Sequence, residues 1–588
     1  MKLKTSFFNC GLLKSNLKRF WPLYLAYFAV LLLAIPMSAL NIPGEPGKVI
    51  IDSLSYYLDD ISLIVTFITA ISAAMCVYGF MYTQKTCGMV ASLPLKRKTI
   101  FASSACSGII PILIINLIVG LITAIPLINH PDSFALESLF IWFAVTSMHY
   151  IAFFGIASFI AVITGNTVAL PVFYMVFNFL ALGVESAIRE IFSDFIYGFS
   201  NAMSKISFEF LSPFSHMIGR KTLMSSYAVG PEAPVVTGVS YPEWRIVIIY
   251  AAVGIAFLVA SMFIFRKRKM ENCGDIIAVP FLRPVFKYCV ALCAAMANGI
   301  LLRGIFGSYG ILSIDAATYL VYLILGAFIG YFGSEMLLRK RFAVFKGNWL
   351  GFGLLVVFCA AFMWCCVTDY IGIGSSTPEL SEIGYVEIST ARSSDLLYLE
   401  EPSSIANVVK MNKSIIKNKD THINAGLDDS LFVSIDYHLK SGRIVSREYQ
   451  ISSYSQDYGL YKDILSSDEA KRYFFTPDVD VAPEHIEYCC FGYFNSDTGE
   501  STYLDLTPEQ AADFFTNGYT ADIIAGNLNY YSAPAENLAY MEINFVGDEN
   551  SSVKDLTHLY FRCYIDPECK NSLSWVLDNL GIDLTELF

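Results

Sequence analysis

The sequence predicts a polytopic α-helical membrane protein with about nine transmembrane helices and a cytoplasmic N-terminus, followed by an extracytoplasmic α+β domain. The first observation is composition: 55% of the 588 residues are apolar and only 16% are charged, against about 25% charged in soluble proteins. The second is charge segregation. Residues 1–371 contain 26 Lys and Arg against 17 Asp and Glu, whereas residues 372–588 contain 14 against 35. These values disfavour a single soluble enzyme, a nucleic-acid-binding protein and a disordered chain.

The third observation is a set of nine apolar windows, each close to the roughly 20 residues that a membrane-spanning helix requires. The first window is too long for the apolar region of a signal peptide, and no small-residue cleavage pattern follows it. We therefore expect it to remain as a span. The windows are residues 21–40, 61–82, 106–128, 139–164, 167–187, 246–265, 286–305, 316–337 and 350–370.

Basic residues indicate the orientation of these spans, because short cytoplasmic loops are enriched in Lys and Arg. With nine spans, all four basic clusters lie on one side, whereas the connections 41–60 and 129–138 carry almost no basic residues. The N-terminus is therefore predicted to be cytoplasmic, and residues 372–588 extracytoplasmic. The clusters are Lys14, Lys18 and Arg19; Lys85, Lys96, Arg97 and Lys98; Arg266, Lys267, Arg268 and Lys269; and Arg339, Lys340, Arg341 and Lys346.

Three segments outside the spans have distinctive patterns. Residues 1–20 contain an amphipathic stretch that predicts a helix in the cytoplasmic interface, the alternative being a plain start to the first span. The loop 83–104 combines Gly88, an apolar stretch and a basic cluster, and its Pro94 suits the first turn of a short helix. Residues 188–215 carry an apolar stripe that predicts outer amphipathic helices, or a surface helix packed on the C-terminal domain.

Taken in this order, these segments resemble the permease subunit of ABC-2-type transporters. Gly88, Leu93-Pro94 and Arg97 are similar to the G-x(4)-L-P-x-x-R segment with which that family contacts its ATPase. The resemblance covers roughly residues 5–270 and implies a six-span permease core over residues 21–265. Three further spans in residues 266–371 and the domain 372–588 are similar to a subgroup of Gram-positive bacterial permeases. The resemblance thus implies the bacterial cytoplasmic membrane.

The resemblance also implies partners. A G-x(4)-G-K-[ST] segment is absent from the chain, so we expect no ATP-binding site here, no cofactor and no enzymatic activity. ATP and Mg would belong to a separate ATPase subunit, and a second permease subunit, identical or homologous, would complete the pathway. The segment 266–288 is a second candidate contact, or equally an attachment to anionic lipid. The coupling residues would be Gly88, Leu93, Pro94, Lys96, Arg97 and Lys98.

Few ionisable residues lie within the spans, where they are usually functional. His149 is a candidate pathway residue, the alternative being a hydrogen-bonded contact between helices. Glu335 and Arg339 are spaced for a pair within one helix, and Arg303 is expected to extend toward the interface. Gly326 and Gly330 predict close helix packing. Because no series of acidic residues crosses the membrane, we expect a hydrophobic or amphipathic substrate rather than ion coupling.

The segment 372–588 alternates strand-like and helix-like runs, which predicts an α+β domain built of repeated strand–helix units. It shows no catalytic constellation, and its histidines are scattered: His422, His438, His485 and His558. Asp478, Asp480 and Glu484 form an acidic cluster that we interpret as a solvated loop rather than a Ca²⁺ site. The net charge of −21 favours a cationic partner such as a basic peptide, or simply solubility.

Four cysteines lie in this domain, namely Cys489, Cys490, Cys563 and Cys569. A bridge between Cys563 and Cys569, or from Cys489 or Cys490 to Cys563, is one interpretation, and free buried thiols are the other. The leading functional prediction is an exporting permease driven by a separate ATPase. The alternative is a non-transporting membrane sensor whose external domain binds a cationic peptide.

Overall fold

The computed structural model divides into two compact units, Met1–Ile191 with Ile206–Trp364 and Phe192–Lys205 with Cys365–Phe588. The described residues are 8–36, 46–128, 132–200, 208–218, 220, 223–228, 235–269, 273–307, 315–345, 347–389, 396–423, 430–477, 481–495, 500–528, 539–545 and 560–584.

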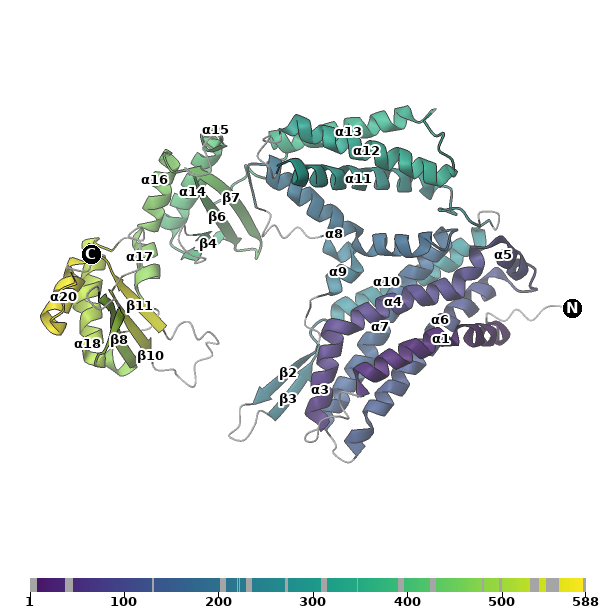
Figure 1. Ribbon diagram of the computed structural model, residues 1–588, viewed down its shortest axis with the longest axis horizontal. Helices are drawn as coiled ribbons and strands as arrows, with labels where there is room; N and C mark the ends of the chain where they lie inside the picture. The colour runs from purple at the N-terminus through teal and green to yellow at the C-terminus, as the bar shows by residue number, and fades with distance from the viewer. Residues whose placement is uncertain are drawn as a thin grey trace. The chain divides into compact units, whose positions relative to one another are not determined.

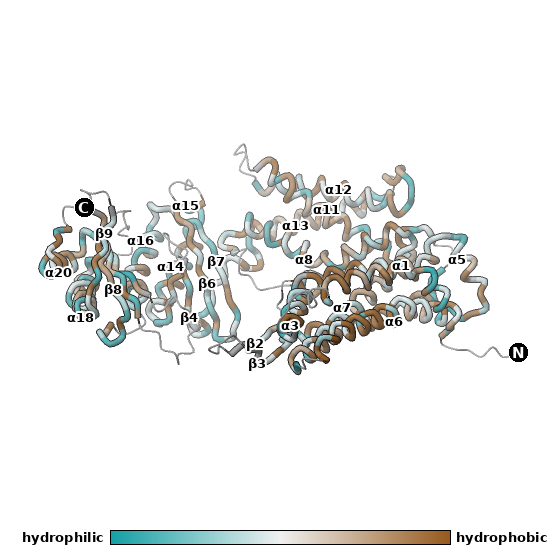
Figure 2. The backbone as a smooth tube through the Cα atoms, turned by 60° about the horizontal axis from the view of Figure 1, so that its bottom comes forward, coloured by the Kyte–Doolittle hydropathy of each residue, from teal (hydrophilic) through white to brown (hydrophobic). Residues whose placement is uncertain are grey.

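Within the described residues, nine helices are long and apolar enough to cross a membrane, as the nine windows predict. Figure 2 shows the apolar character of the long helices and the mixed polarity of the C-terminal region. The helices (Figure 1) are α1 (Cys10–Ala34), α4 (Ser62–Tyr78), α6 (Arg97–Thr123), α7 (Ser133–Ile163), α8 (Ala169–Phe195), α10 (Trp244–Lys267), α11 (Leu282–Gly307), α12 (Ala316–Arg339) and α13 (Trp349–Thr368).

The predicted boundary between an interfacial helix and the first span is a kink inside one helix. α1 begins at Cys10, and Phe20 has non-helical angles, with φ −109° and ψ 16°. Pro22 follows two residues later, and proline removes a helical hydrogen bond and crowds the preceding turn. The connection 41–60 is partly helical, since α3 (Pro46–Tyr56) and a π-helical turn lead into α4.

The prediction of separate amphipathic helices over residues 188–215 is largely wrong. Residues 188–195 continue α8, and the chain then enters a short strand, β1 (Gly198–Phe199). Gly198 has a φ of +82°, a conformation that ends a right-handed helix and that glycine adopts at little cost. Residues 201–207 lie outside the described residues. A 3₁₀ turn (Glu209–Leu211), α9 (Pro213–Met217) and a hairpin of β2 (Met224–Ala228) and β3 (Val235–Ser240) follow.

Glycines set the closest helix contacts of the first unit. α7, the most buried of the nine helices, crosses α10 at Gly155, where an added Cβ would lie 2.1 Å from the carbonyl oxygen of Gly254. In α12, a Cβ at Gly326 would lie 2.4 Å from the Ala294 carbonyl oxygen of α11, and Gly330 is similarly close. The predicted close packing at Gly326 and Gly330 is therefore confirmed.

The C-terminal region consists of two modules with the same topology: two strands, helix, two strands, helix. Each sheet is antiparallel, and the third strand lies beside the first. This confirms repeated strand–helix units. Module A contains β4 (Ile383–Ser389), β5 (Leu396–Leu399), α14 (Pro402–Lys417), α15 (Lys419–Ile423), β6 (Ser430–Leu439), β7 (Ile444–Ser452), α16 (Gln456–Leu465) and α17 (Asp468–Phe475). Module B contains β8 (Ile486–Asn495), β9 (Glu500–Asp505), α18 (Pro508–Asp513), α19 (Thr520–Ala525), β10 (Ala539–Phe545), β11 (Tyr560–Ile565) and α20 (Lys570–Leu580).

Each module has its own apolar core. In module B, β10 alternates between buried and half-buried residues, so that one face of the sheet packs under the helices. Thr507 caps α18 through a reciprocal capping box with Gln510, with Pro508 in the first turn. In module A, β1 adds a fifth strand by pairing with β7. The segment that continues α8 is thus part of the module A sheet.

Candidate functional site

Several helices of the first unit end together at what we call the basic end, the end that carries Lys96, Arg97, Arg268 and Lys340. There the short helix α5 (Gln84–Ala91) follows α4, and α6 begins at Arg97. Pro94 lies in the turn between these helices, not in the first turn of a helix as predicted. The turn is short because Leu95 donates its backbone N–H to the Leu93 carbonyl, at 2.7 Å.

The predicted coupling residues form a largely exposed surface on this loop. Gly88 has no atom within 4 Å of an added Cβ, and neighbouring Met89 is 64% exposed, while Leu93 is 38% exposed. Pro94, Lys96 and Arg97 are also exposed, and Lys98 is half-buried. The loop therefore combines exposed apolar side chains with positive charge, which suits contact with another protein.

Arg97 differs from the other coupling residues because its guanidinium is engaged within the chain. Its Nη1 donates to the carbonyls of Arg266 at 3.1 Å and Arg268 at 2.8 Å. These carbonyls end α10, and such unpaired helix-terminal oxygens attract cations. Arg97 thus ties the beginning of α6 to the end of α10.

Arg268 is the residue that sequence reasoning missed, since it lies inside a basic cluster with no distinguishing pattern. It is 4% exposed. Its guanidinium donates to the carbonyls of Ala161 at 3.2 Å, Val162 at 3.0 Å and Met81 at 3.3 Å. It thereby joins the ends of α4 and α7, and burial lowers its pKa from the usual value.

The segment 273–283, part of the second predicted contact, is bound to the same end. Gly274 donates to the carbonyl of Gly165 at 2.6 Å, and Ile277 forms a bridge with Thr164. Asp275 pairs with Lys340 at 2.8 Å and Arg283 at 3.2 Å. Hydrogen bonds and ion pairs therefore make the basic end one connected platform.

A cavity of about 470 Å³ opens beside the coupling loop. One wall is the beginning of α1, including Asn16 and Arg19, and the other is the loop with Leu93 and Pro94. α1 is held there by hydrogen bonds from the Asn9 backbone N–H to Ser103, at 2.9 Å, and from Asn16 to Ser107, at 3.0 Å. The amphipathic part of α1 and the coupling loop thus line one cavity.

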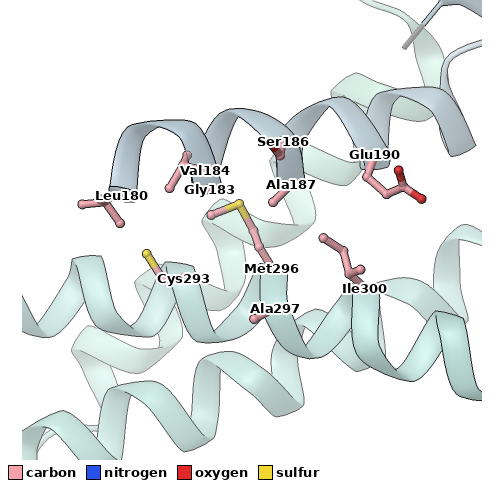
Figure 3. Close-up of a pocket in the computed structure, with 10 residues that line it drawn as sticks. All are labelled: Leu180, Gly183, Val184, Ser186, Ala187, Glu190, Cys293, Met296, Ala297 and Ile300. Carbon is pink, nitrogen blue, oxygen red and sulfur yellow. The ribbon is translucent and has the colours of Figure 1, made fainter. Parts of the chain in front are cut away.

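A second hollow lies between α8 and α11, where two adjoining cavities of about 500 and 710 Å³ share Leu180, Cys293 and Ala297. They run along α8 from Val168 to Glu190, about 30 Å at 1.5 Å per residue, which matches the bilayer hydrocarbon thickness. The hollow exists because small side chains line part of the two facing helices. Figure 3 shows the half away from the basic end, lined by Leu180, Gly183, Val184, Ser186, Ala187, Glu190, Cys293, Met296, Ala297 and Ile300.

Contacts between α8 and α11 lie near both ends of this groove. Near the basic end, Phe173 meets Phe286 edge to face, with ring centroids 5.2 Å apart. At the other end, Arg303 pairs with Glu190 at 2.6 Å. Arg303 therefore bonds to a neighbouring helix, a partner that the sequence does not indicate. The groove is apolar along its length and has a charged pair at one end.

Glu335 forms the predicted pair with Arg339, at 2.5 Å, and also a second pair with Lys287 of α11, at 3.3 Å. The second contact links α12 to α11, which the spacing within one helix could not indicate. His149 is 3% exposed, and its Nδ1 has no hydrogen-bond partner among the described residues. It lines neither the groove nor the cavity beside the loop.

The four cysteines of module B are free thiols, as are the other ten in the chain, so neither predicted bridge is formed. Cys489 and Cys563 lie on β8 and β11, which are separated by β10. Two strand spacings amount to about 10 Å, beyond the reach of a disulfide. The Cys569 thiol instead accepts a hydrogen bond from the Asp566 backbone, at 3.3 Å.

No cluster of three or more His, Cys, Asp or Glu side chains among the described residues is arranged to hold a metal ion. Glu484 lies in an exposed 3₁₀ turn, whereas Asp478, Asp480 and His558 lie outside the described residues. His422 donates to Asp457 at 2.9 Å and accepts the Ser452 N–H at 3.2 Å, inside module A. This pair is buried, and the Oδ1 atom of Asp457 has no hydrogen-bond partner among the described residues. Comparison with protein families, curated proteins and solved structures finds no match to this chain.

Proposed function

We propose that this chain is the membrane-spanning permease subunit of an ABC-2-type transporter in a bacterial cytoplasmic membrane. A separate ATPase subunit drives it, and ATP and Mg bind to that subunit. A second permease subunit, identical or homologous, completes the pathway. The basic end then faces the cytoplasm, and modules A and B are extracytoplasmic. The direction we favour is export.

The exposed coupling loop is the observation that carries this proposal. Met89, Leu93 and Pro94 present apolar surface beside Lys96, and interfaces commonly place apolar contacts inside a polar rim. The loop is backed by the network of Arg97 and Arg268, so a push on it moves α4, α6, α7 and α10 together. A motor subunit that closes on ATP would act through such a rigid contact.

The groove between α8 and α11 supports a hydrophobic or amphipathic substrate. Its walls are aliphatic and aromatic side chains, whereas Glu190 and Arg303 supply charge at one end. Apolar cavity walls favour hydrocarbon over water. An amphipathic molecule could place its chain along the groove and its polar group at the charged end.

Co-purification tests the first part of the proposal. The full chain is expressed in its native host with an affinity tag, and associated proteins are identified by mass spectrometry. We expect an ATPase subunit with a G-x(4)-G-K-[ST] segment in a stoichiometric complex. Recovery of the chain alone, from mild detergent and from nanodiscs alike, would contradict it.

Two substitutions test the loop. Leu93→Asp places a charge in the apolar contact and should reduce substrate-stimulated ATPase activity of the complex at least tenfold. Leu380→Asp is the matched control, because Leu380 is 51% exposed at the start of module A. Equal activity of the two variants would remove the loop from the coupling mechanism.

The alternative function is a non-transporting sensor, and β1 is the observation that favours it. α8 ends at Phe195, and β1 at Gly198–Phe199 is already part of the module A sheet. Occupancy of the C-terminal region would therefore act directly on a membrane-spanning helix. ATP-dependent movement of a fluorescent amphiphile in proteoliposomes that contain both subunits would exclude the sensor.

A further inference from the structure

One face of the module B sheet is covered by helices, whereas the opposite face carries tyrosines. The covered face includes Phe491, Met541 and Cys563, all fully buried. On the opposite face, strand register places Tyr503, Gly492, Tyr540 and Tyr564 in one row across β9, β8, β10 and β11. We call this opposite side the tyrosine face.

Glycine at position 492 makes this row possible. A Cβ added there would lie 2.9 Å from the ring of Tyr540 and 3.2 Å from the ring of Tyr503. Real Cβ atoms do not approach a neighbour as closely as the first of these distances. Both rings therefore lean over the glycine, and the row forms a continuous aromatic surface where a larger residue would separate the rings.

The neighbouring row shows what this surface can hold. The guanidinium of Arg562 lies 4.4 Å from the ring centroid of Tyr540, and it pairs with Glu542 at 2.9 Å. In the same row, Asp505 accepts a hydrogen bond from Tyr488 at 2.9 Å. A cation stacked on tyrosine and paired with a carboxylate is thus already present once on this face.

Arg562 also lies 6.0 Å from the ring centroid of Tyr564, whereas no cation–π contact among the described residues involves Tyr503 or Tyr488. Tyr503 is 59% exposed, Tyr488 45% and Tyr564 42%. Exposed aromatic side chains gathered on one sheet face are typical of interaction surfaces, which are enriched in tyrosine. The face therefore offers several rings, with carboxylates next to them, to a partner.

Charge indicates the nature of that partner. Residues 481–588 contain 18 Asp and Glu but only three Lys and Arg, a net charge of −15. Residues 372–480 contain 17 and 11, a net charge of −6. The two modules share a topology, so the fold does not require this difference. The field around module B attracts polycations and repels polyanions.

We propose that the tyrosine face of module B is the docking site for an arginine- or lysine-rich polypeptide segment. Cationic side chains stack on Tyr503, as Arg562 stacks on Tyr540, and pair with Asp505. This goes beyond the proposed function by naming a partner of the C-terminal region and the surface that binds it. The docking proposal rests on the proposed function in one respect only: that function decides from which side of the membrane the peptide arrives.

The test uses the full chain in nanodiscs of neutral phosphatidylcholine, without any ATPase, so that its result does not depend on transport. The probe is a fluorescein-labelled peptide of eight arginines, and binding is measured by anisotropy. We expect Tyr503→Ala to weaken binding about three- to tenfold, as loss of a cation–π contact does. Tyr503→Phe keeps the ring and should bind within twofold of the native chain.

Tyr454→Ala is the matched control, because Tyr454 is 84% exposed in module A, and we expect its affinity to be unchanged. Any of these outcomes overturns the proposal: no binding of the probe, equal affinity of the Tyr503→Ala and Tyr454→Ala variants, or equal binding of a peptide of eight glutamates. Displacement of the probe by a neutral tetramer of N-acetylglucosamine would assign the face to a glycan instead, and would also overturn it.

Discussion

Modules A and B have the same strand order but are stabilised by different interiors. In the core of module A, Asn412 donates to Tyr437 at 2.9 Å and accepts from Tyr449 at 2.6 Å, and module A contains no cysteine. The core of module B instead contains the buried thiols of Cys489, Cys563 and Cys569. Module A also extends its sheet with β1, whereas the described residues add no further strand to the sheet of module B. The same strand order thus serves module A, whose sheet pairs with β1, and module B, whose sheet exposes the tyrosine face.

The largest expected effect concerns the polar core of module A. Asn412→Leu leaves the buried hydroxyls of Tyr437 and Tyr449 without their partner, which should cost about 3 kcal/mol of stability. Hydrogen exchange of β6 and β7 in the full chain measures it. The control Asn517→Leu removes an exposed contact of module B and should leave exchange unchanged. Similar exchange in both variants would show that the network does not stabilise module A.

The attachment of β1 is tested by two glycines with similar backbone angles. Gly198 and Gly442 have φ of +82° and +80°, but an added Cβ meets Tyr449 at 2.5 Å only at Gly198. Gly442→Ala should cost about 1 kcal/mol from backbone strain alone, and Gly198→Ala about 2 kcal/mol. Faster hydrogen exchange of β7 only in Gly198→Ala would show that β1 supports module A. Equal effects of the two substitutions would show that only backbone strain is involved and that β1 does not stabilise module A.

A smaller effect is expected at the tyrosine face. Gly492→Ala pushes the rings of Tyr540 and Tyr503 apart and should cost about 1 kcal/mol, with a loss of probe binding. Gly459→Ala in α16 of module A has open space around the added methyl and should be neutral or slightly stabilising. Thermal unfolding measures the stability of both variants, and the anisotropy assay measures their binding of the probe. Unchanged binding of the peptide probe by the Gly492→Ala variant would show that the tyrosine face does not require this glycine.

The smallest expected effect concerns the chemical reactivity of the buried thiols in module B. Burial raises the pKa of Cys489 to about 11 and of Cys569 to about 12, and it also raises that of Cys563. A raised pKa leaves these groups as neutral thiols at pH 8, and only the thiolate reacts. N-ethylmaleimide should therefore modify exposed Cys10 first, and the module B thiols only after denaturation. Early modification of Cys563 would contradict a packed core in module B.

Sequence patterns within a single segment were sufficient to predict the structure of that segment. Nine apolar windows predict the nine long helices, because the length of a span follows from the bilayer and not from neighbouring helices. Thr507, Pro508 and Gln510 predict a capped helix, because capping joins residues three apart. Gly326 and Gly330 predict a close contact but not its partner, α11. The strand–helix alternation predicts repeated units but not their shared strand order.

Contacts between distant segments were decided only by the tertiary structure. Arg268 lies among three other basic residues, and only folding places it against the carbonyls of Met81 and Ala161. The same holds for the groove between α8 and α11 and for β1, whose residues continued an apolar helical stripe. The tyrosine face depends on strand register, which brings Tyr503, Tyr540 and Tyr564 into one row. The physical reason is that local sequence sets helix length, caps and alternation, whereas pairing of remote polar groups depends on the assembled backbone.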